Sequence, residues 1–100
     1  MILPPQIRRT GQADEDLISI WLEIAKDDTA AADRVLDAIE RRWQQLVDFP
    51  YSGIAREDVA PDIRHLVAGQ YLTLYRIADD AIEIIRILHG RRKIAPAAVE

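Results

Sequence analysis

The sequence predicts an α+β domain in which a short N-terminal strand, an antiparallel helical hairpin and an antiparallel β-sheet follow one another in the order β-α-α-β-β-β. Apolar residues recur at helical spacing in two stretches within residues 10–48, and three extended-type stretches follow Gly53. The chain has 100 residues, of which 49% are hydrophobic and 30% are charged, with only 4 glycines and 5 prolines. This composition is typical of one compact domain, which we expect to span residues 1–100.

The first half of the chain is predicted to form one short strand and two helices. Residues 6–9 follow a proline pair that favours extended backbone, so we interpret them as an edge strand. Thr10 is the predicted N-cap of a first helix, which should end near Lys26. A second cap lies in residues 27–29, and the second, longer helix should end before Pro50. Because few residues join the two helices, we expect them to pack antiparallel as a hairpin.

After Gly53 the hydrophobic pattern changes from helical to extended. The three predicted strands are residues 63–68, 71–77 and 81–88. The dipeptides Gly69-Gln70 and Asp79-Asp80 separate them, and such dipeptides are typical of tight hairpins. We therefore expect a three-stranded antiparallel meander beneath the helices, with Trp21 and Trp43 packed in the core.

The last predicted strand is apolar on both sides. Strict alternation places Ile82, Ile84 and Leu88 on one face and Ile85 and Ile87 on the other. A single helical layer covers only one face of a sheet. We therefore expect an exposed apolar surface near Ile85, Ile87 and the sheet edge, where a partner helix or strand binds.

The charge of the chain argues against general nucleic-acid binding. The chain has 13 basic and 17 acidic side chains and a formal net charge of -4, whereas nucleic-acid binders neutralise phosphates with an excess of basic groups. Residues 1–60 hold 7 basic and 12 acidic side chains, and residues 61–100 hold 6 and 5. Any anionic partner should therefore meet the C-terminal part of the chain.

Several classes of site are not expected in this sequence. The chain has no cysteine, so it has no disulfide or thiolate nucleophile, and a cytoplasmic location fits best. No apolar stretch approaches the ~20 residues that span a bilayer, so we expect no membrane segment. His65 and His89 lie on different predicted strands without metal-ligand spacing, so we expect no metal. Isolated glycines and the contexts of the two serines give no phosphate loop or nucleophile elbow, so we expect no cofactor and no catalytic residue.

Arginines are the most informative polar residues in the second half. Arg64, Arg76 and Arg86 fall on three successive predicted strands, and residues 91–93 add three more cations. If the strand arginines share a face, they form a cationic surface beside His89 that can bind phosphate or carboxylate. The alternative is that they form cross-strand ion pairs. The acidic candidates for such pairs are Asp62, Asp79 and Glu83.

A set of motifs spread over nearly the whole chain resembles a known family. The motifs are the helix segment from Ala13 to Trp21, the P-x-x-G-x-x-R turn at Pro50 to Arg56, Arg64, Tyr75-Arg76, and I-x-R-I-L-H-G-R-R at Ile84 to Arg92. Together they resemble the ParE branch of the RelE/ParE toxin superfamily, the toxins of bacterial toxin-antitoxin pairs often called plasmid stabilisation proteins.

The resemblance implies a growth-inhibiting toxin that a co-encoded antitoxin inactivates. The implied antitoxin is a ParD-like protein of the ribbon-helix-helix type, whose C-terminal segment wraps around the toxin in a hetero-oligomer. ParE-like toxins are described as poisons of DNA gyrase, whereas RelE-like relatives cut messenger RNA on the ribosome. We predict antitoxin contacts at Tyr71, Tyr75, Ile85 and Ile87.

The two activities in this superfamily need different residues. RNA cleavage by 2′-hydroxyl attack requires a general base, a general acid and cationic groups. In RelE-like nucleases these are sheet arginines or lysines and a C-terminal tyrosine or histidine-tyrosine pair. Here His89 matches the histidine position, but Gly90 follows it and no tyrosine occurs after Tyr75. The incomplete set favours non-enzymatic gyrase inhibition. A ribosome-dependent endoribonuclease and a member without remaining toxicity are the alternatives.

We predict target contacts at His89, Arg91 and Arg92, and next at Arg64, Arg76 and Arg86.

Overall fold

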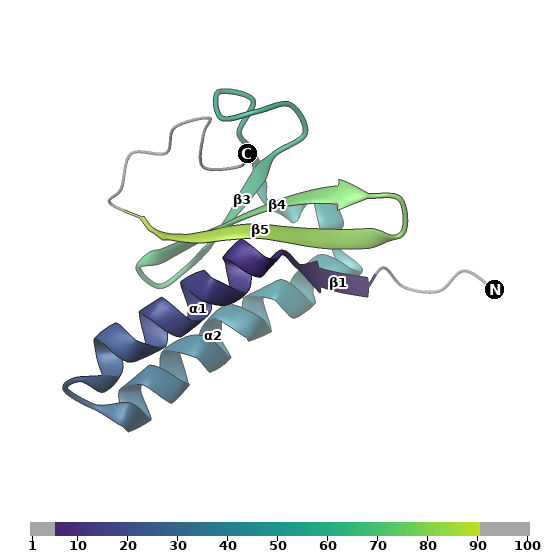
Figure 1. Cartoon of the computed structure of the whole chain (residues 1–100). Helices are drawn as coiled ribbons and strands as arrows, with labels where there is room; N and C mark the ends of the chain where they lie inside the picture. Colours follow the sequence, from purple (N-terminus) through teal and green to yellow (C-terminus); the bar gives the residue numbers. More distant parts are fainter. Residues whose placement is uncertain (1–5, 91–100) are drawn as a thin grey trace.

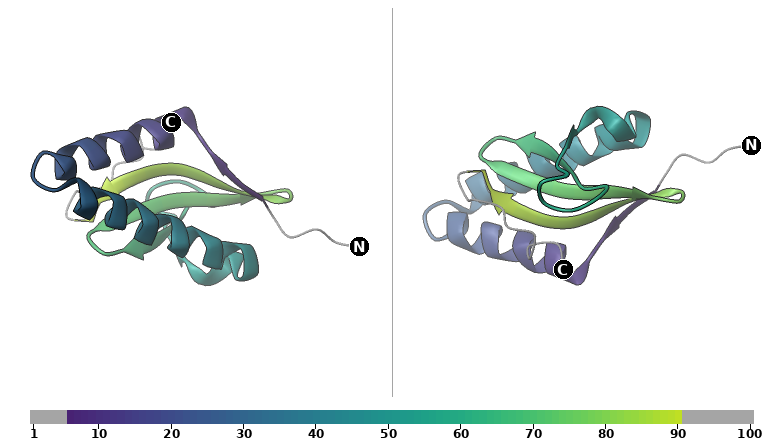
Figure 2. Two further views of the ribbon diagram at one scale, coloured as in Figure 1. Left: turned by 90° about the horizontal axis from the view of Figure 1, so that it is seen from below. Right: turned by 90° about the horizontal axis from the view of Figure 1, so that it is seen from above.

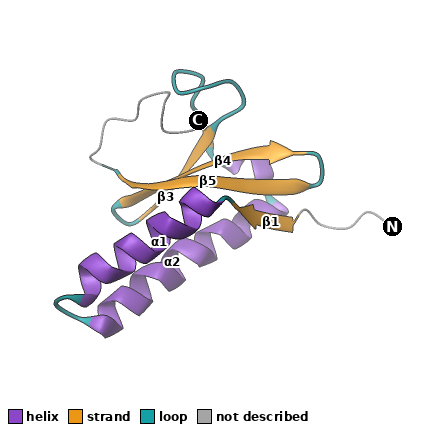
Figure 3. Cartoon of the chain, viewed as in Figure 1, coloured by secondary structure: helices purple, strands orange, loops and turns teal. Residues whose placement is uncertain are grey.

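The computed structural model describes residues 6–90, and its elements follow the predicted order (Figure 1). They are β1 (Gln6–Arg9), α1 (Gly11–Ala25), α2 (Thr29–Asp48), the 3-10 turn η1 (Pro50–Ser52), β2 (Ile54–Ala55), β3 (Arg64–Ala68), β4 (Tyr71–Ala78) and β5 (Ala81–His89). The α+β fold class is confirmed, with both helices on one side of the sheet (Figure 3). The sequence analysis did not predict β2.

Side-chain caps begin both helices where the sequence predicts them. The Thr10 hydroxyl accepts a hydrogen bond from the Ala13 N–H at 3.0 Å, and the Asp28 carboxylate accepts one from the Ala31 N–H at 3.0 Å. The Thr10 hydroxyl also donates to the carbonyl of Ile85 at 2.8 Å, which ties the start of α1 to the last strand. The caps therefore fix where both helices begin, and the Thr10 bond to Ile85 also fixes the position of α1 on the sheet.

The two tryptophans occupy different environments. Trp43 is 3% exposed, and its indole N–H donates to the hydroxyl of the buried Thr73 at 2.8 Å, so its predicted core position is confirmed. Trp21 is only half-buried, and its indole N–H donates to Asp33 at 2.8 Å on the surface of the hairpin. The prediction of a core position for Trp21 was wrong, because this side chain bridges the two helices on their outer side.

The sheet has five strands in the order β1-β5-β4-β3-β2. The meander from β2 to β5 is antiparallel, but β1 pairs with β5 in parallel, with Gln6 opposite Ala81 and Arg9 opposite Ile84. The sheet is therefore mixed rather than wholly antiparallel. The four residues of β1 include a single apolar side chain, Ile7, and carry no information about the direction of the neighbouring strand, so the sequence could not show this.

An irregularity in the pairing of β4 with β5 changes the predicted faces of the last strand. Leu74 lies opposite Arg86 and Tyr75 lies opposite Ile84, so Ile85 is the extra residue of a β-bulge. Beyond the bulge the alternation shifts by one residue. As a result, Ile87 packs in the core on the helix side, and Leu88 packs with Ile85 on the other side. The predicted faces of Ile87 and Leu88 were therefore wrong.

The side of the sheet away from the helices is covered by the chain itself. Residues 56–63 form a loop over this face, as the two views in Figure 2 show. Val59 and Ile63 from the loop pack with Leu74, Ile85 and Leu88 in a second, smaller core. Ile85 is 8% exposed and Ile87 is 2% exposed. The exposed apolar surface expected around these two residues is not formed, because the loop and the helices cover them.

Candidate functional site

Arg64 lies beyond the C-terminal end of α2 and is held by backbone carbonyls. Its Nη1 donates to the carbonyl of Gly53 at 2.8 Å and to that of Tyr51 at 3.4 Å. Its guanidinium carbon lies 5.0 Å from the centre of the Tyr51 ring, a cation–π contact. Tyr75 completes this site, since its hydroxyl accepts from the Gly53 N–H at 3.0 Å and donates to the Pro50 carbonyl at 2.8 Å. Burial raises the pKa of Tyr75 above its usual value, so the phenol stays protonated.

The other two strand arginines form ion pairs at separate places. Arg76 pairs with Glu83 across the β4–β5 ladder at 2.8 Å, as the cross-strand alternative predicted. Arg86 is held by Asp16 in α1 through two hydrogen bonds of 2.7 and 3.1 Å, and the same carboxylate accepts from the Ile87 N–H at 3.0 Å. The hydrogen bond with Asp16 raises the pKa of Arg86. The three arginines therefore do not form one shared cationic surface.

His89 lies at the end of β5 beside the β3–β4 turn. Its Nε2 is 3.3 Å from the side-chain oxygen of Gln70, and its ring meets the Tyr71 ring edge-on at 5.6 Å between centroids. Tyr71 and His89 line one cavity of about 290 Å³, and Tyr71 also lines an adjacent apolar groove of about 390 Å³ between the helices and this turn. His89 is thus a surface residue next to an apolar depression and apart from Arg64.

A third cluster was missed by the sequence analysis. Arg56 binds Asp58 through two hydrogen bonds of 2.9 Å, and its Nη1 lies 3.0 Å from Nδ1 of His65. The bond with Asp58 raises the pKa of Arg56, and Arg56 lowers that of Asp58. The P-x-x-G-x-x-R motif ends at Arg56, which was the available signal, but nothing in the sequence indicates that the loop brings this arginine back to His65.

Comparison with known proteins decides which family the chain belongs to. Residues 7–94 match the family model described as the ParE toxin of the type II toxin-antitoxin system parDE. The chain belongs to the ParE toxin family. It is also 29% identical over 91 residues to Toxin ParE3 of Caulobacter vibrioides, a match that covers 90% of this chain and 91% of that one.

Two solved structures share the fold of this ParE toxin. The chromosomal ParDE TA system from P. aeruginosa matches with a TM-score of 0.74 at 20% identity, over 85% of this chain and 95% of that one. The toxin-antitoxin complex RelBE2 from Mycobacterium tuberculosis matches with a TM-score of 0.57 at 26% identity, over 87% of this chain and 99% of that one. These two structures confirm the predicted fold, and the family model described above confirms the predicted family.

Half of the ten predicted partner contacts in this ParE toxin are either buried or outside the described residues. Tyr75 is fully buried, and Ile85 and Ile87 are buried with small exposed fractions, so the structure offers little of these three side chains to a partner. Tyr71 is partly exposed. Arg91 and Arg92 lie outside the described residues, so their role as target contacts stays a prediction.

Residues 6–90 contain neither a membrane-spanning helix nor a cluster of metal ligands. Neither helix within residues 6–90 is long and apolar enough to cross a membrane. The same residues contain no group of three histidine, aspartate or glutamate side chains placed to hold a metal ion.

We expect this ParE toxin to lose stability as the pH falls below about 6.5, the usual pKa of histidine. Burial, and next the neighbouring Arg56, lower the pKa of His65 in the folded chain, while Asp58 acts in the opposite direction. Below about pH 6.5 the unfolded chain therefore binds a proton that folded His65 does not, and this difference favours unfolding. Above that pH both states hold His65 neutral, and the loss disappears.

Denaturant unfolding at about pH 7.5 and about pH 5.5 measures this effect. The His65→Gln variant keeps a side chain that can accept a hydrogen bond from Arg56 but cannot take up the proton. Its stability should depend less on pH than that of the unmodified chain. Equal dependence in the two proteins would contradict the role of His65.

Proposed function

We propose that this ParE toxin arrests growth by binding DNA gyrase in the bacterial cytoplasm, without catalysing a reaction. The observation that carries this choice is the separation of the cations. Arg64 is bound to backbone carbonyls, Arg76 to Glu83 and Arg86 to Asp16. A nuclease must bring cationic groups together to stabilise the charge that develops on one phosphorus. Separate, internally bonded arginines fit a protein-binding surface better.

The nuclease alternative depends on His89. Its ring is half-exposed at the end of β5, where it is accessible to an RNA strand. The side chains of Gln70 and Tyr71 lie beside the ring, and neither is a strong base. His89 would have to act without the tyrosine that the resemblance assigns to RelE-like nucleases. The assays proposed below therefore include a result that would support the nuclease.

We further propose that a ParD-like antitoxin of the ribbon-helix-helix type neutralises the toxin in a hetero-oligomer. The apolar groove beside Tyr71 supports this, since Ile24, Val35, Ala38 and Ala68 line it together with that tyrosine. Such a groove fits an amphipathic helix, whose apolar face covers the apolar lining. The structural relatives named above are toxin-antitoxin systems, which is consistent with this partner.

Growth and biochemical assays distinguish the proposed activity from its alternative. Induction without antitoxin should stop growth with filamentation and a DNA-damage response while translation continues at first. Purified toxin should inhibit gyrase supercoiling, and co-expressed antitoxin should restore growth. Early ribosome-dependent cleavage of a reporter transcript that is lost in His89→Ala would instead support the nuclease. Normal growth after induction of a folded chain would show a member without toxicity.

The predicted cationic tail is tested in the same assays. Arg91→Ala combined with Arg92→Ala should leave antitoxin binding nearly unchanged and abolish growth arrest, because an interface arginine contributes about 2 kcal/mol or more to binding. Full toxicity of this double variant would remove the tail from the proposed interface.

A further inference from the structure

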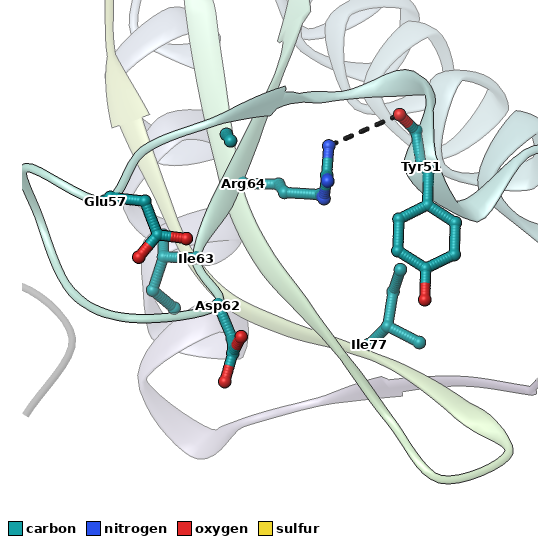
Figure 4. A pocket seen from close by; sticks show the side chains of 7 residues that line it. Tyr51, Glu57, Asp62, Ile63, Arg64 and Ile77 are labelled. Carbon is teal, nitrogen blue, oxygen red and sulfur yellow. Dashed lines mark hydrogen bonds between the residues drawn. The ribbon is translucent and has the colours of Figure 1, made fainter.

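A small pocket opens beside Arg64, at the end of the sheet beyond α2. Its volume is about 130 Å³, and apolar side chains from Tyr51, Ile63 and Ile77 line it. In Figure 4 the Tyr51 ring and Ile77 lie on one side of Arg64, and Glu57, Asp62 and Ile63 lie on the other. We call this the Arg64 pocket. It is smaller than the ~300–1,000 Å³ of typical small-molecule sites, so it fits the end of a protein side chain better than a nucleotide.

The guanidinium of Arg64 is held in place before any partner arrives. The two carbonyl bonds described above use Nη1 alone, and the Tyr51 ring supports the flat face of the group. Within residues 6–90 no carboxylate forms an ion pair with Arg64, and its Nε and Nη2 have no hydrogen-bond partner. These two nitrogens form the fork that binds a carboxylate in bidentate geometry, and a fixed side chain loses less entropy on binding.

The charges around the pocket select among anions. Glu57 and Asp62 are exposed carboxylates on its rim, so two negative charges lie near one positive charge. This arrangement disfavours a phosphate group with a charge near -2. It favours a carboxylate that enters towards Arg64 with a lysine or arginine beside it to meet the rim. Such a pair of opposite charges is readily presented on the surface of a folded protein.

We propose that the Arg64 pocket binds an acidic side chain, flanked by a basic one, on the surface of the protein target of this toxin. The inference rests on the proposed function, which requires one large protein partner. The target is the occupant rather than the antitoxin, because the antitoxin is assigned to the apolar groove beside Tyr71, whereas this pocket carries both signs of charge. Arginine and tyrosine are enriched among the residues that dominate binding energy, and a bound partner would remove Arg64 and the exposed Tyr51 from water.

Two variants of the full chain test the pocket, each with a matched control. Arg64→Lys keeps the charge but removes the fork, and Arg41→Lys makes the same change at an exposed position on α2. Glu57→Gln with Asp62→Asn neutralises the rim, and asparagine tolerates the positive φ of 66° at position 62. Asp37→Asn with Glu40→Gln removes two exposed charges elsewhere and so controls for net charge.

The readouts are the Kd for purified gyrase, the Kd for the antitoxin, and growth arrest. We expect Arg64→Lys to weaken gyrase binding by ~30-fold and the rim variant to weaken it by ~5-fold, with the antitoxin Kd and both controls nearly unchanged. Unchanged gyrase binding by folded Arg64→Lys would overturn the proposal. A loss of antitoxin binding with gyrase binding retained would assign the pocket to the antitoxin and overturn it as well.

Two further outcomes separate this proposal from the gyrase assignment. If the unmodified toxin does not bind gyrase, the proposed target is wrong, and the pocket is then judged by growth arrest alone. Full growth arrest by both pocket variants would overturn the proposed role of the Arg64 pocket. Loss of growth arrest with normal antitoxin binding would support that role towards a different protein target. If Arg64→Lys unfolds early, the rim variant decides, because it leaves Arg64 and its carbonyl bonds in place.

Discussion

Replacing Trp43 with alanine is expected to lower the free energy of unfolding by about 3–5 kcal/mol, a large fraction of the stability of a domain of this size. Trp43 is 3% exposed, so its removal leaves a cavity between α2 and the sheet. It also removes the N–H donor to Thr73, a residue that is 1% exposed, so the buried hydroxyl loses this hydrogen bond. Growth arrest should fall together with stability, because the chain loses its folded form.

Denaturant titration of the isolated toxin measures this loss. Trp43→Phe separates its causes, since it retains much of the apolar volume but leaves the Thr73 hydroxyl without its partner, and it should lose about 1–3 kcal/mol. Trp21→Ala is the matched control, because Trp21 is half-buried and its indole N–H donates to Asp33 at the surface. A loss from Trp21→Ala as large as that from Trp43→Ala would show that the core does not depend on Trp43.

The second large effect is expected from Gly53→Ala, with a loss of about 3 kcal/mol from overpacking. An added Cβ at Gly53 would lie 2.7 Å from the backbone oxygen of His65 and 2.7 Å from Cε1 of Tyr75, and closer still to the Tyr75 hydroxyl oxygen. Tyr75 is fully buried and cannot move aside without cost. Gly53 has φ of -73°, so the cost comes from space and not from backbone strain.

The same substitution would separate the Tyr75 hydroxyl from the Gly53 N–H and the Pro50 carbonyl, and would disturb the carbonyl that holds Arg64. Thermal melting measures the loss of stability. Gly11→Ala is the matched control, because a Cβ there meets nothing within 4 Å and lies in a helix, where alanine is favourable. A Gly53→Ala chain that melts like Gly11→Ala would mean that the turn after α2 is not close-packed.

Among the strand arginines, the sequence offered cross-strand ion pairs with Asp62, Asp79 or Glu83 as the alternative to a shared cationic surface. The pair of Arg76 with Glu83 across the β4–β5 hairpin is an example, since a two-residue turn sets its register. The pair of Arg86 with Asp16 joins residues 70 positions apart, and nothing near either residue indicates the other. The same holds for Arg64, whose partners are backbone carbonyls that are common to every residue type.

The sequence by itself determined the helices, their caps and the three long strands, because capping, hydrophobic period and turn residues act over a few neighbouring positions. Tertiary structure alone decided the parallel pairing of β1 with β5, the bulge at Ile85 and the loop over the far face. The bulge changed which isoleucines face the helices, and the loop covered the surface expected to bind a partner. The direction of β1, the bulge in β5 and the path of the loop depend on contacts between residues far apart in the sequence, and these contacts form only when the whole chain folds.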